Sequence, residues 1–74
     1  MSGSTFPRVA AAHDRLVRLP EVLGRTGLSR SSVYRMMAAG EFPRAAPLGR
    51  RGVGWPESEV SAWIASRMAA RGDA

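Results

Sequence analysis

Residues 19–40, LPEVLGRTGLSRSSVYRMMAAG, predict two short helices joined at Thr26-Gly27-Leu28. Pro20 suits the first turn of the first helix, where a missing N–H costs nothing. Gly27 can adopt the positive φ that ends that helix, and Ser29 is a good N-cap for the next one. Two helices joined by a tight glycine turn form a unit that can place its second helix in the major groove of DNA.

Apolar residues recur at helical spacing and define the expected core. Methionine at such positions is usually core filler. We also expect both tryptophans to be buried, because no second aromatic row interleaves with the arginines as in a nucleic-acid stacking platform. The predicted stripes are Leu19, Val22 and Leu23; Val33, Met36 and Met37; and Val60, Trp63, Ile64 and Met68.

The segment Phe42 to Trp55 predicts a two-stranded hairpin with a turn at Gly49-Arg50-Arg51-Gly52. A last helix is expected to open at Trp55-Pro56-Glu57 and to fray beyond Met68. The predicted fold is mainly α with a small β-hairpin, a winged helix-turn-helix. We divide the chain into a flexible N-terminal arm (1–14), a winged helix-turn-helix domain (15–70) and a frayed tail (71–74).

Composition narrows the classes of function. With 74 residues the chain has room for one core, and it has no cysteine and a single histidine, His13. We therefore expect no disulfide, no metal site, no cofactor or other small-molecule ligand, and no enzymatic activity, since a histidine-dependent triad cannot be assembled. No apolar run approaches the length of a membrane span, and we expect a cytoplasmic protein.

The positive charge is concentrated in the middle of the chain. Residues 1–14 carry one arginine and one acid, net 0; residues 15–54 carry eight arginines and two acids, net +6; residues 55–74 carry two arginines and three acids, net −1. All eleven basic residues are arginine, the better bidentate donor to phosphate and guanine. This asymmetry favours double-stranded DNA as the partner.

The second helix is the candidate recognition helix. Arg30, Ser31 and Ser32 occupy its first turn, the part that meets base edges in this geometry. Tyr34 and Arg35 fall on the same polar face, with Ser32 near its boundary. The alternatives are a merely solvated face for the arginines and, for Tyr34, a ring packed over the helix surface.

The turn between the predicted strands is the candidate wing. Arg50 and Arg51 lie at its tip between two glycines, where a narrow loop can follow the DNA backbone or enter a minor groove. The alternative is a solvated turn with no ligand. Arg8, in the N-terminal arm, could also reach nucleic acid.

Several blocks of the sequence resemble the AlpA family of prophage regulators, which is similar to phage excisionases and to the winged-helix heads of MerR-type regulators. The resemblance implies a DNA-binding winged helix-turn-helix, encoded by a bacterium or phage and acting at the nucleoid. It matches Arg30, Ser32, Tyr34 and Arg35 to the recognition helix and Arg51 to the basic wing residue; Arg50 falls where the family varies. The blocks are Arg18-Leu19-Pro20-Glu21-Val22, Thr26 to Arg35, Gly40-Glu41-Phe42-Pro43, Leu48-Gly49, Val53-Gly54-Trp55, Glu57-Ser58-Glu59-Val60 and Trp63-Ile64.

Three functions remain open at this point. The first is a sequence-specific transcriptional regulator of a prophage or integrative element, and the second is an excisionase with the same DNA-binding head. The third is a non-enzymatic adaptor whose basic face docks an acidic protein. Since one motif covers only a few base pairs, specific binding requires a homodimer or a cooperative multimer on repeated sites.

Overall fold

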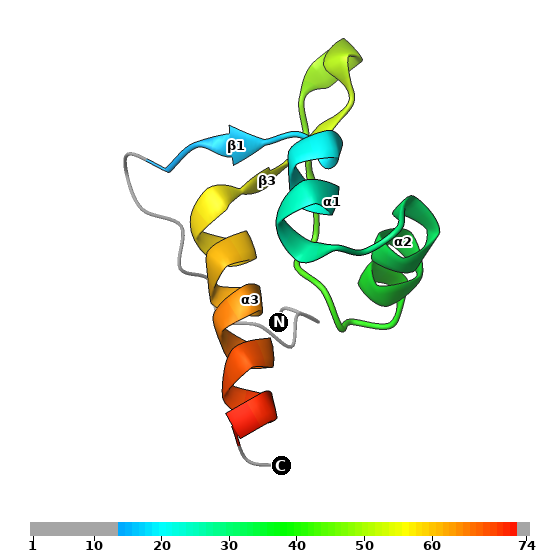
Figure 1. Ribbon diagram of the computed structural model, residues 1–74. Helices are drawn as coiled ribbons and strands as arrows, with labels where there is room; N and C mark the ends of the chain where they lie inside the picture. The colour runs from blue at the N-terminus through cyan, green and yellow to red at the C-terminus, as the bar shows by residue number, and fades with distance from the viewer. Residues whose placement is uncertain (1–13, 73–74) are drawn as a thin grey trace.

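The computed structural model describes residues 14–72 (Figure 1). Three helices and a small antiparallel sheet make this part of the chain mainly α, as the sequence predicts. The elements, in chain order, are β1 (Leu16–Val17), α1 (Leu19–Thr26), α2 (Arg30–Ala38), β2 (Ala46–Pro47), a 3-10 turn (Gly49–Arg51), β3 (Val53–Pro56) and α3 (Glu57–Gly72). The proposed arm lies outside the described residues, except for Asp14.

The helix-turn-helix begins and ends where the sequence predicts. Pro20 lies in the first turn of α1, and Gly27 follows its last residue with φ 76°. The amide of Gly27 donates to the carbonyl oxygen of Leu23 at 2.8 Å, which closes the helix end. After α2, Gly40 also has φ 76°, and the amide of Glu41 donates back to the carbonyl oxygen of Met36 at 2.7 Å.

The sheet has the strand order β1-β3-β2, with both pairings antiparallel. The predicted hairpin corresponds to β2 and β3, where Ala46 lies opposite Gly54. On the other side of β3, Val17 of β1 lies opposite Trp55. The sequence does not reveal β1, because a strand of two residues is too short to show the alternation that identifies one.

The start of α3 differs from the prediction. Trp55 and Pro56 lie in β3, and the helix begins at Glu57. Pairing with β1 holds this segment extended: Pro56 lies opposite Leu16, and the amide of Glu57 donates to the carbonyl oxygen of Arg15 at 2.8 Å. At its other end α3 continues to Gly72, beyond the point where fraying is expected.

The core confirms the predicted burial of both tryptophans. Phe42 packs edge-on against the two rings, with centroid distances of 6.5 Å to Trp55 and 4.9 Å to Trp63. Met68, however, is 55% exposed, so its predicted place in the buried stripe of α3 is wrong; it lies in the part of α3 beyond the last core residue, Trp63. The buried side chains are Val17, Leu19, Val22, Val33, Phe42, Trp55, Val60 and Trp63.

Both indole N–H groups are bonded to the loop that follows α2. Trp55 Nε1 donates to the carbonyl oxygen of Pro43 at 3.0 Å, and Trp63 Nε1 donates to that of Glu41 at 2.9 Å. A buried indole N–H without a partner would be costly, so these bonds fix the path of the loop. The C-terminal end of α2 is thereby attached to the core.

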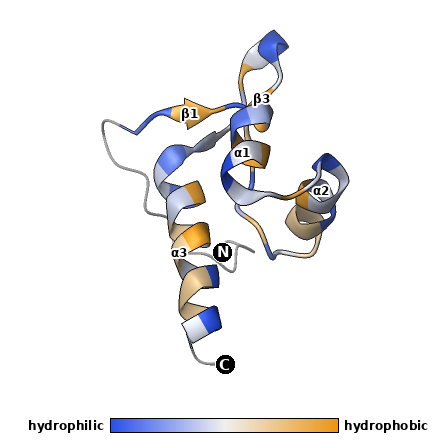
Figure 2. Cartoon of the chain, viewed as in Figure 1, coloured by the Kyte–Doolittle hydropathy of each residue, from blue (hydrophilic) through white to orange (hydrophobic). Residues whose placement is uncertain are grey.

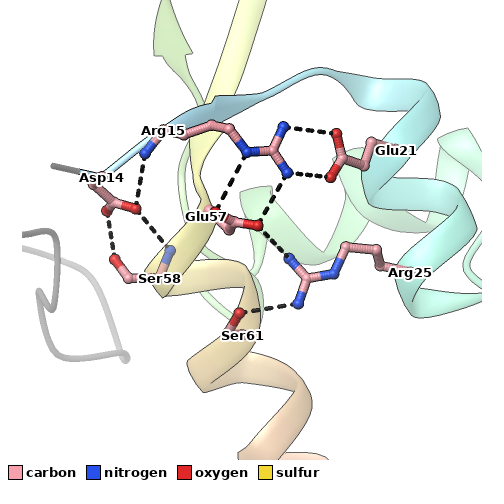
Figure 3. Close-up of polar contacts among 7 residues, drawn as sticks. All are labelled: Asp14, Arg15, Glu21, Arg25, Glu57, Ser58 and Ser61. Atoms are coloured by element: carbon pink, nitrogen blue, oxygen red, sulfur yellow. Dashed lines mark hydrogen bonds and ion pairs between the residues drawn. The ribbon is translucent and has the colours of Figure 1, made fainter.

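An ion cluster joins Arg15, the residue before β1, to α1 and α3 (Figure 3). The Arg15 guanidinium donates to Glu21 at 2.6 Å and to Glu57 at 3.0 Å. Arg25 lies 3.9 Å from the Glu57 carboxylate and donates to Ser61 Oγ at 2.9 Å. The hydrogen bond from Arg15 is the main cause that lowers the pKa of Glu21 below its ordinary value.

Asp14 belongs structurally with the domain. Its carboxylate accepts from the amide of Ser58 at 3.1 Å and from the Ser58 hydroxyl, in the first turn of α3 (Figure 3). A carboxylate at this position caps free N–H groups and suits the positive end of the helix dipole. Asp14 therefore connects the chain before β1 to the first turn of α3.

The lowered pKa of Glu21 predicts a pH effect on stability. A carboxyl group with a depressed folded-state pKa stabilises the fold above its unfolded-state pKa, and this stability is lost as the pH falls through the folded-state value. Glu21→Gln should therefore lower the melting temperature slightly at neutral pH and flatten its decline in acid. Thermal melts between neutral and strongly acidic pH test this, with the exposed Glu41→Gln as control. If the melting temperatures of Glu21→Gln and the wild type fell equally steeply with decreasing pH, Glu21 would not be the cause of the acid sensitivity.

Candidate nucleic-acid interface

The N-terminus of α2 is organised by serine hydroxyl groups. Ser29 is the N-cap of α2, as predicted: its Oγ accepts a hydrogen bond from the amide of Ser32 at 3.2 Å. The same hydroxyl donates to Ser32 Oγ at 2.9 Å. Ser31 Oγ lies 3.4 Å from Ser29 Oγ. Ser32 is therefore half-buried and engaged in the cap, whereas Ser31 is exposed.

The predicted polar face of α2 is exposed. Arg30, Ser31, Tyr34 and Arg35 are all solvent-accessible, with Tyr34 41% exposed, while Val33 on the opposite side is fully buried. Residues four apart lie above one another on a helix, so these side chains form one face. An exposed fraction of 41% for Tyr34 is compatible both with a place on this face and with a ring packed over the helix surface.

The wing is a tight turn between β2 and β3. Gly49 and Gly52 have φ of 64° and 99°, a region that other residues rarely adopt. The amide of Leu48 donates to the carbonyl oxygen of Gly52 at 2.7 Å, which closes the turn. Arg50 and Arg51 are both exposed at its tip. Figure 2 shows strongly hydrophilic residues at this tip and on α2.

Arg18 was not singled out from the sequence, yet it contacts the wing. Arg18 immediately precedes α1. Its guanidinium donates a hydrogen bond to the carbonyl oxygen of Arg51 in the wing. A Cβ atom at Gly52 would lie 3.4 Å from Nη2 of Arg18, so the two segments are in close contact. No local sequence signal marks this pairing, since the two residues are 33 positions apart.

The arginines of the positive segment fall into two groups. Arg15 and Arg25 are paired with acids in the ion cluster, so they do not add free charge to a binding surface. The other six arginines of residues 15–54 form no ion pair with any residue in 14–72: Arg18, Arg30, Arg35, Arg44, Arg50 and Arg51. Arg44, exposed in the loop between α2 and β2, is an additional candidate that the sequence interpretation did not name.

Two further features of the described residues concern metal ions and membranes. Within 14–72, no group of three or more histidine, cysteine, aspartate or glutamate side chains is placed to hold a metal ion. His13 and Arg8 lie outside this range. No helix in the described part of the chain combines the length and the apolar character needed to cross a membrane.

Comparison with known proteins identifies the family. The family model described as prophage CP4-57 regulatory protein (AlpA) matches residues 15–68. The ORF88 protein of Enterobacteria phage P4 is 48% identical over 66 residues, which cover 89% of this chain and 75% of that protein. The DNA-binding transcriptional activator AlpA of Escherichia coli K12 is 34% identical over 59 residues, covering 72% of this chain and 84% of that protein. The resemblance found in the sequence is thus confirmed, and the chain belongs to the AlpA family of prophage regulatory proteins.

Proposed function

We propose that this protein is a sequence-specific DNA-binding transcriptional regulator of a prophage or integrative element. In this proposal α2 enters the major groove and the wing lies along the phosphate backbone. The observation that carries it is the exposed face of α2, where Arg30 and Arg35 flank Ser31 and Tyr34 and form no ion pair within residues 14–72. The relative named as a DNA-binding transcriptional activator supports the same function.

The chemistry of α2 suits contact with both bases and phosphates. An arginine can donate two hydrogen bonds to the major-groove edge of guanine. The exposed hydroxyl of Ser31 sits at the helix N-terminus, whose free amides favour an anion. Ser32 takes a different part in this proposal, because its hydroxyl is engaged by the cap: it orders the first turn that presents Arg30.

An excisionase is the second candidate, since it would use the same DNA-binding head. Immunoprecipitation of bound genomic DNA separates the candidates. A few sharp sites at a promoter support the regulator, and sites confined to an attachment region beside an integrase gene support excision. A flat profile would favour the third candidate, an adaptor that docks an acidic protein, and would contradict sequence-specific binding.

Specific binding by so small a head requires more than one copy. A single recognition helix contacts only a few base pairs, so we propose that the protein acts as a homodimer or as a cooperative multimer on repeated sites. Binding to duplexes with one or two copies of the site tests this. A steeper binding curve on the two-copy duplex is expected; independent binding to each copy would contradict it.

Removing both wing arginines should weaken DNA binding without changing its sequence preference. Phosphate contacts position a protein but carry no sequence information, so Arg50→Ala/Arg51→Ala should lower affinity for specific and scrambled duplexes alike. If four to six phosphates are neutralised per protomer, the log–log salt slope of the wild type should be about −3.6 to −5.4, and about 1.8 units flatter in the variant. Filter binding at several salt concentrations measures it. An unchanged slope would show that the wing does not touch phosphate.

Arg18 should act on DNA through the wing that it holds. Losing its hydrogen bond to the Arg51 carbonyl should free the turn and weaken binding about fivefold, equivalent to roughly 1 kcal/mol. In the background that already lacks Arg50 and Arg51, Arg18→Ala should have little further effect. Arg44→Ala is the matched control. Within residues 14–72, Arg44 makes no hydrogen bond to the wing, so the loss of DNA affinity in this variant should add fully to that of the wing variant. Additive losses for Arg18 would instead mean that it contacts DNA directly.

A further inference from the structure

A pocket lies between the last turn of α1 and the C-terminal half of α3, and none of its lining residues belongs to α2 or to the wing. Its volume is about 310 Å³. Trp63, Ile64 and Met68 form its apolar wall. In Figure 1 the C-terminal turns of α3 lie at the opposite end of the described structure from the wing. A ligand could therefore occupy the pocket while the wing is on DNA.

The rim of the pocket is basic. Arg67 and Arg71 line it together with Arg25, whose charge is paired with Glu57 in the ion cluster, and among the described residues no acidic side chain lines it. The Arg67 guanidinium lies 4.9 Å from the centroid of the Trp63 ring, a cation–π contact that holds it at the rim. The residues of α3 that line the pocket recur every three or four positions, so their side chains lie along one side of the helix.

We propose that this pocket binds an acidic segment of another protein, whose apolar side chain enters the pocket while flanking carboxylates meet Arg67 and Arg71. The size fits: an apolar cavity of about 150 Å³ can hold benzene, so an open pocket of about twice that volume takes one or two side chains of leucine or phenylalanine size. The exposed Met68 adds an adaptable apolar contact. The proposal concerns a protein contact and does not depend on where DNA binds.

A second copy of the chain and a DNA backbone fit this pocket less well than an acidic peptide segment does. A second copy seated by the same surface would bring Arg67 and Arg71 of both chains together, which like-charge repulsion disfavours. A DNA backbone would satisfy the arginines but offers no apolar group for the wall formed by Trp63, Ile64 and Met68. A carboxylate-rich segment with an apolar anchor satisfies both halves of the site.

The test uses the full chain labelled with ¹⁵N and a panel of synthetic peptides of about 12 residues, each with two leucine or phenylalanine residues on one helical face and several glutamates. The two indole signals provide the readout. Trp63, which lines the pocket, should shift on titration; Trp55, fully buried and bonded to Pro43, should not. Peptides with glutamine in place of glutamate should bind at least about tenfold more weakly.

Variants assign the effect to the pocket. Arg67→Gln/Arg71→Gln and Met68→Ser should each weaken peptide binding about tenfold or more, whereas Ala65→Ser, exposed on α3 but outside the pocket lining, should not. Circular dichroism confirms that each variant is folded. DNA affinity of the arginine variant should stay within about twofold at physiological salt, since screening removes distant charge effects.

Four results would overturn the proposal. They are no Trp63 shift with any acidic peptide at about 1 mM, equal binding of the neutral peptides, a Trp63 shift that follows protein concentration alone, and a Trp63 shift produced by duplex DNA and lost in the arginine variant. The third result would assign the pocket to a second copy of the chain. The fourth would assign it to nucleic acid.

Discussion

Replacing Trp55 with alanine should lower the free energy of unfolding by about 3–5 kcal/mol. The ring is fully buried, packs against Phe42, and its N–H donates to the Pro43 carbonyl. A 74-residue domain has a total stability of about 4–11 kcal/mol at 0.05–0.15 kcal/mol per residue, so this loss approaches the whole of it at the lower end. Urea denaturation measures the change, and DNA binding should fail only to the extent that the domain unfolds.

The matched control is an aromatic residue on the surface. Tyr34→Ala removes a ring that is 41% exposed and should change stability by no more than about 0.5 kcal/mol. Trp55→Phe should fall between the two, because it keeps most of the apolar volume and loses the bond to Pro43. A stability of Trp55→Ala within about 1 kcal/mol of the wild type would contradict the described core.

Replacing Arg30 or Arg35 with alanine should weaken binding to the specific duplex by about 1–3 kcal/mol if the lost contact is bidentate to guanine. Both side chains are exposed and neither belongs to the core, so the stability of the fold should barely change. Fluorescence anisotropy at fixed salt, on a site recovered from the genome, measures the dissociation constants.

Two comparisons make this result specific. Arg71→Ala removes an exposed helical arginine from α3 and should leave DNA affinity nearly unchanged. On a scrambled duplex the losses for Arg30→Ala and Arg35→Ala should be smaller than on the specific site, because base contacts contribute only there. Equal affinity of both recognition-helix variants and the wild type would rule out the proposed docking of α2.

The helix-turn-helix could be predicted because its signals are local. Pro20, Gly27 and Ser29 each act on the backbone within one helical turn, and all three stand where the structure needs them. The start of α3 could not be predicted in the same way. Trp55 and Pro56 are held extended by pairing with β1, a strand of two residues some forty positions earlier.

The candidate site shows the same division between local and distant effects. The exposure of Arg30, Ser31, Tyr34 and Arg35 follows from helical periodicity and is confirmed. The charge count of residues 15–54, by contrast, treats every arginine alike. Only the folded chain shows that Arg15 and Arg25 are paired with acids and that Arg18 holds the wing.

The central claim is that α2 contacts the bases while the wing contacts the backbone. Selection from a library of randomised duplexes tests it directly, with the wild type, Arg30→Ala, Arg35→Ala and the wing variant Arg50→Ala/Arg51→Ala compared side by side. We predict that each α2 variant loses preference at a few base positions, while the wing variant keeps the preference of the wild type at lower affinity. Unchanged preference in both α2 variants, or a changed preference in the wing variant, would contradict the account.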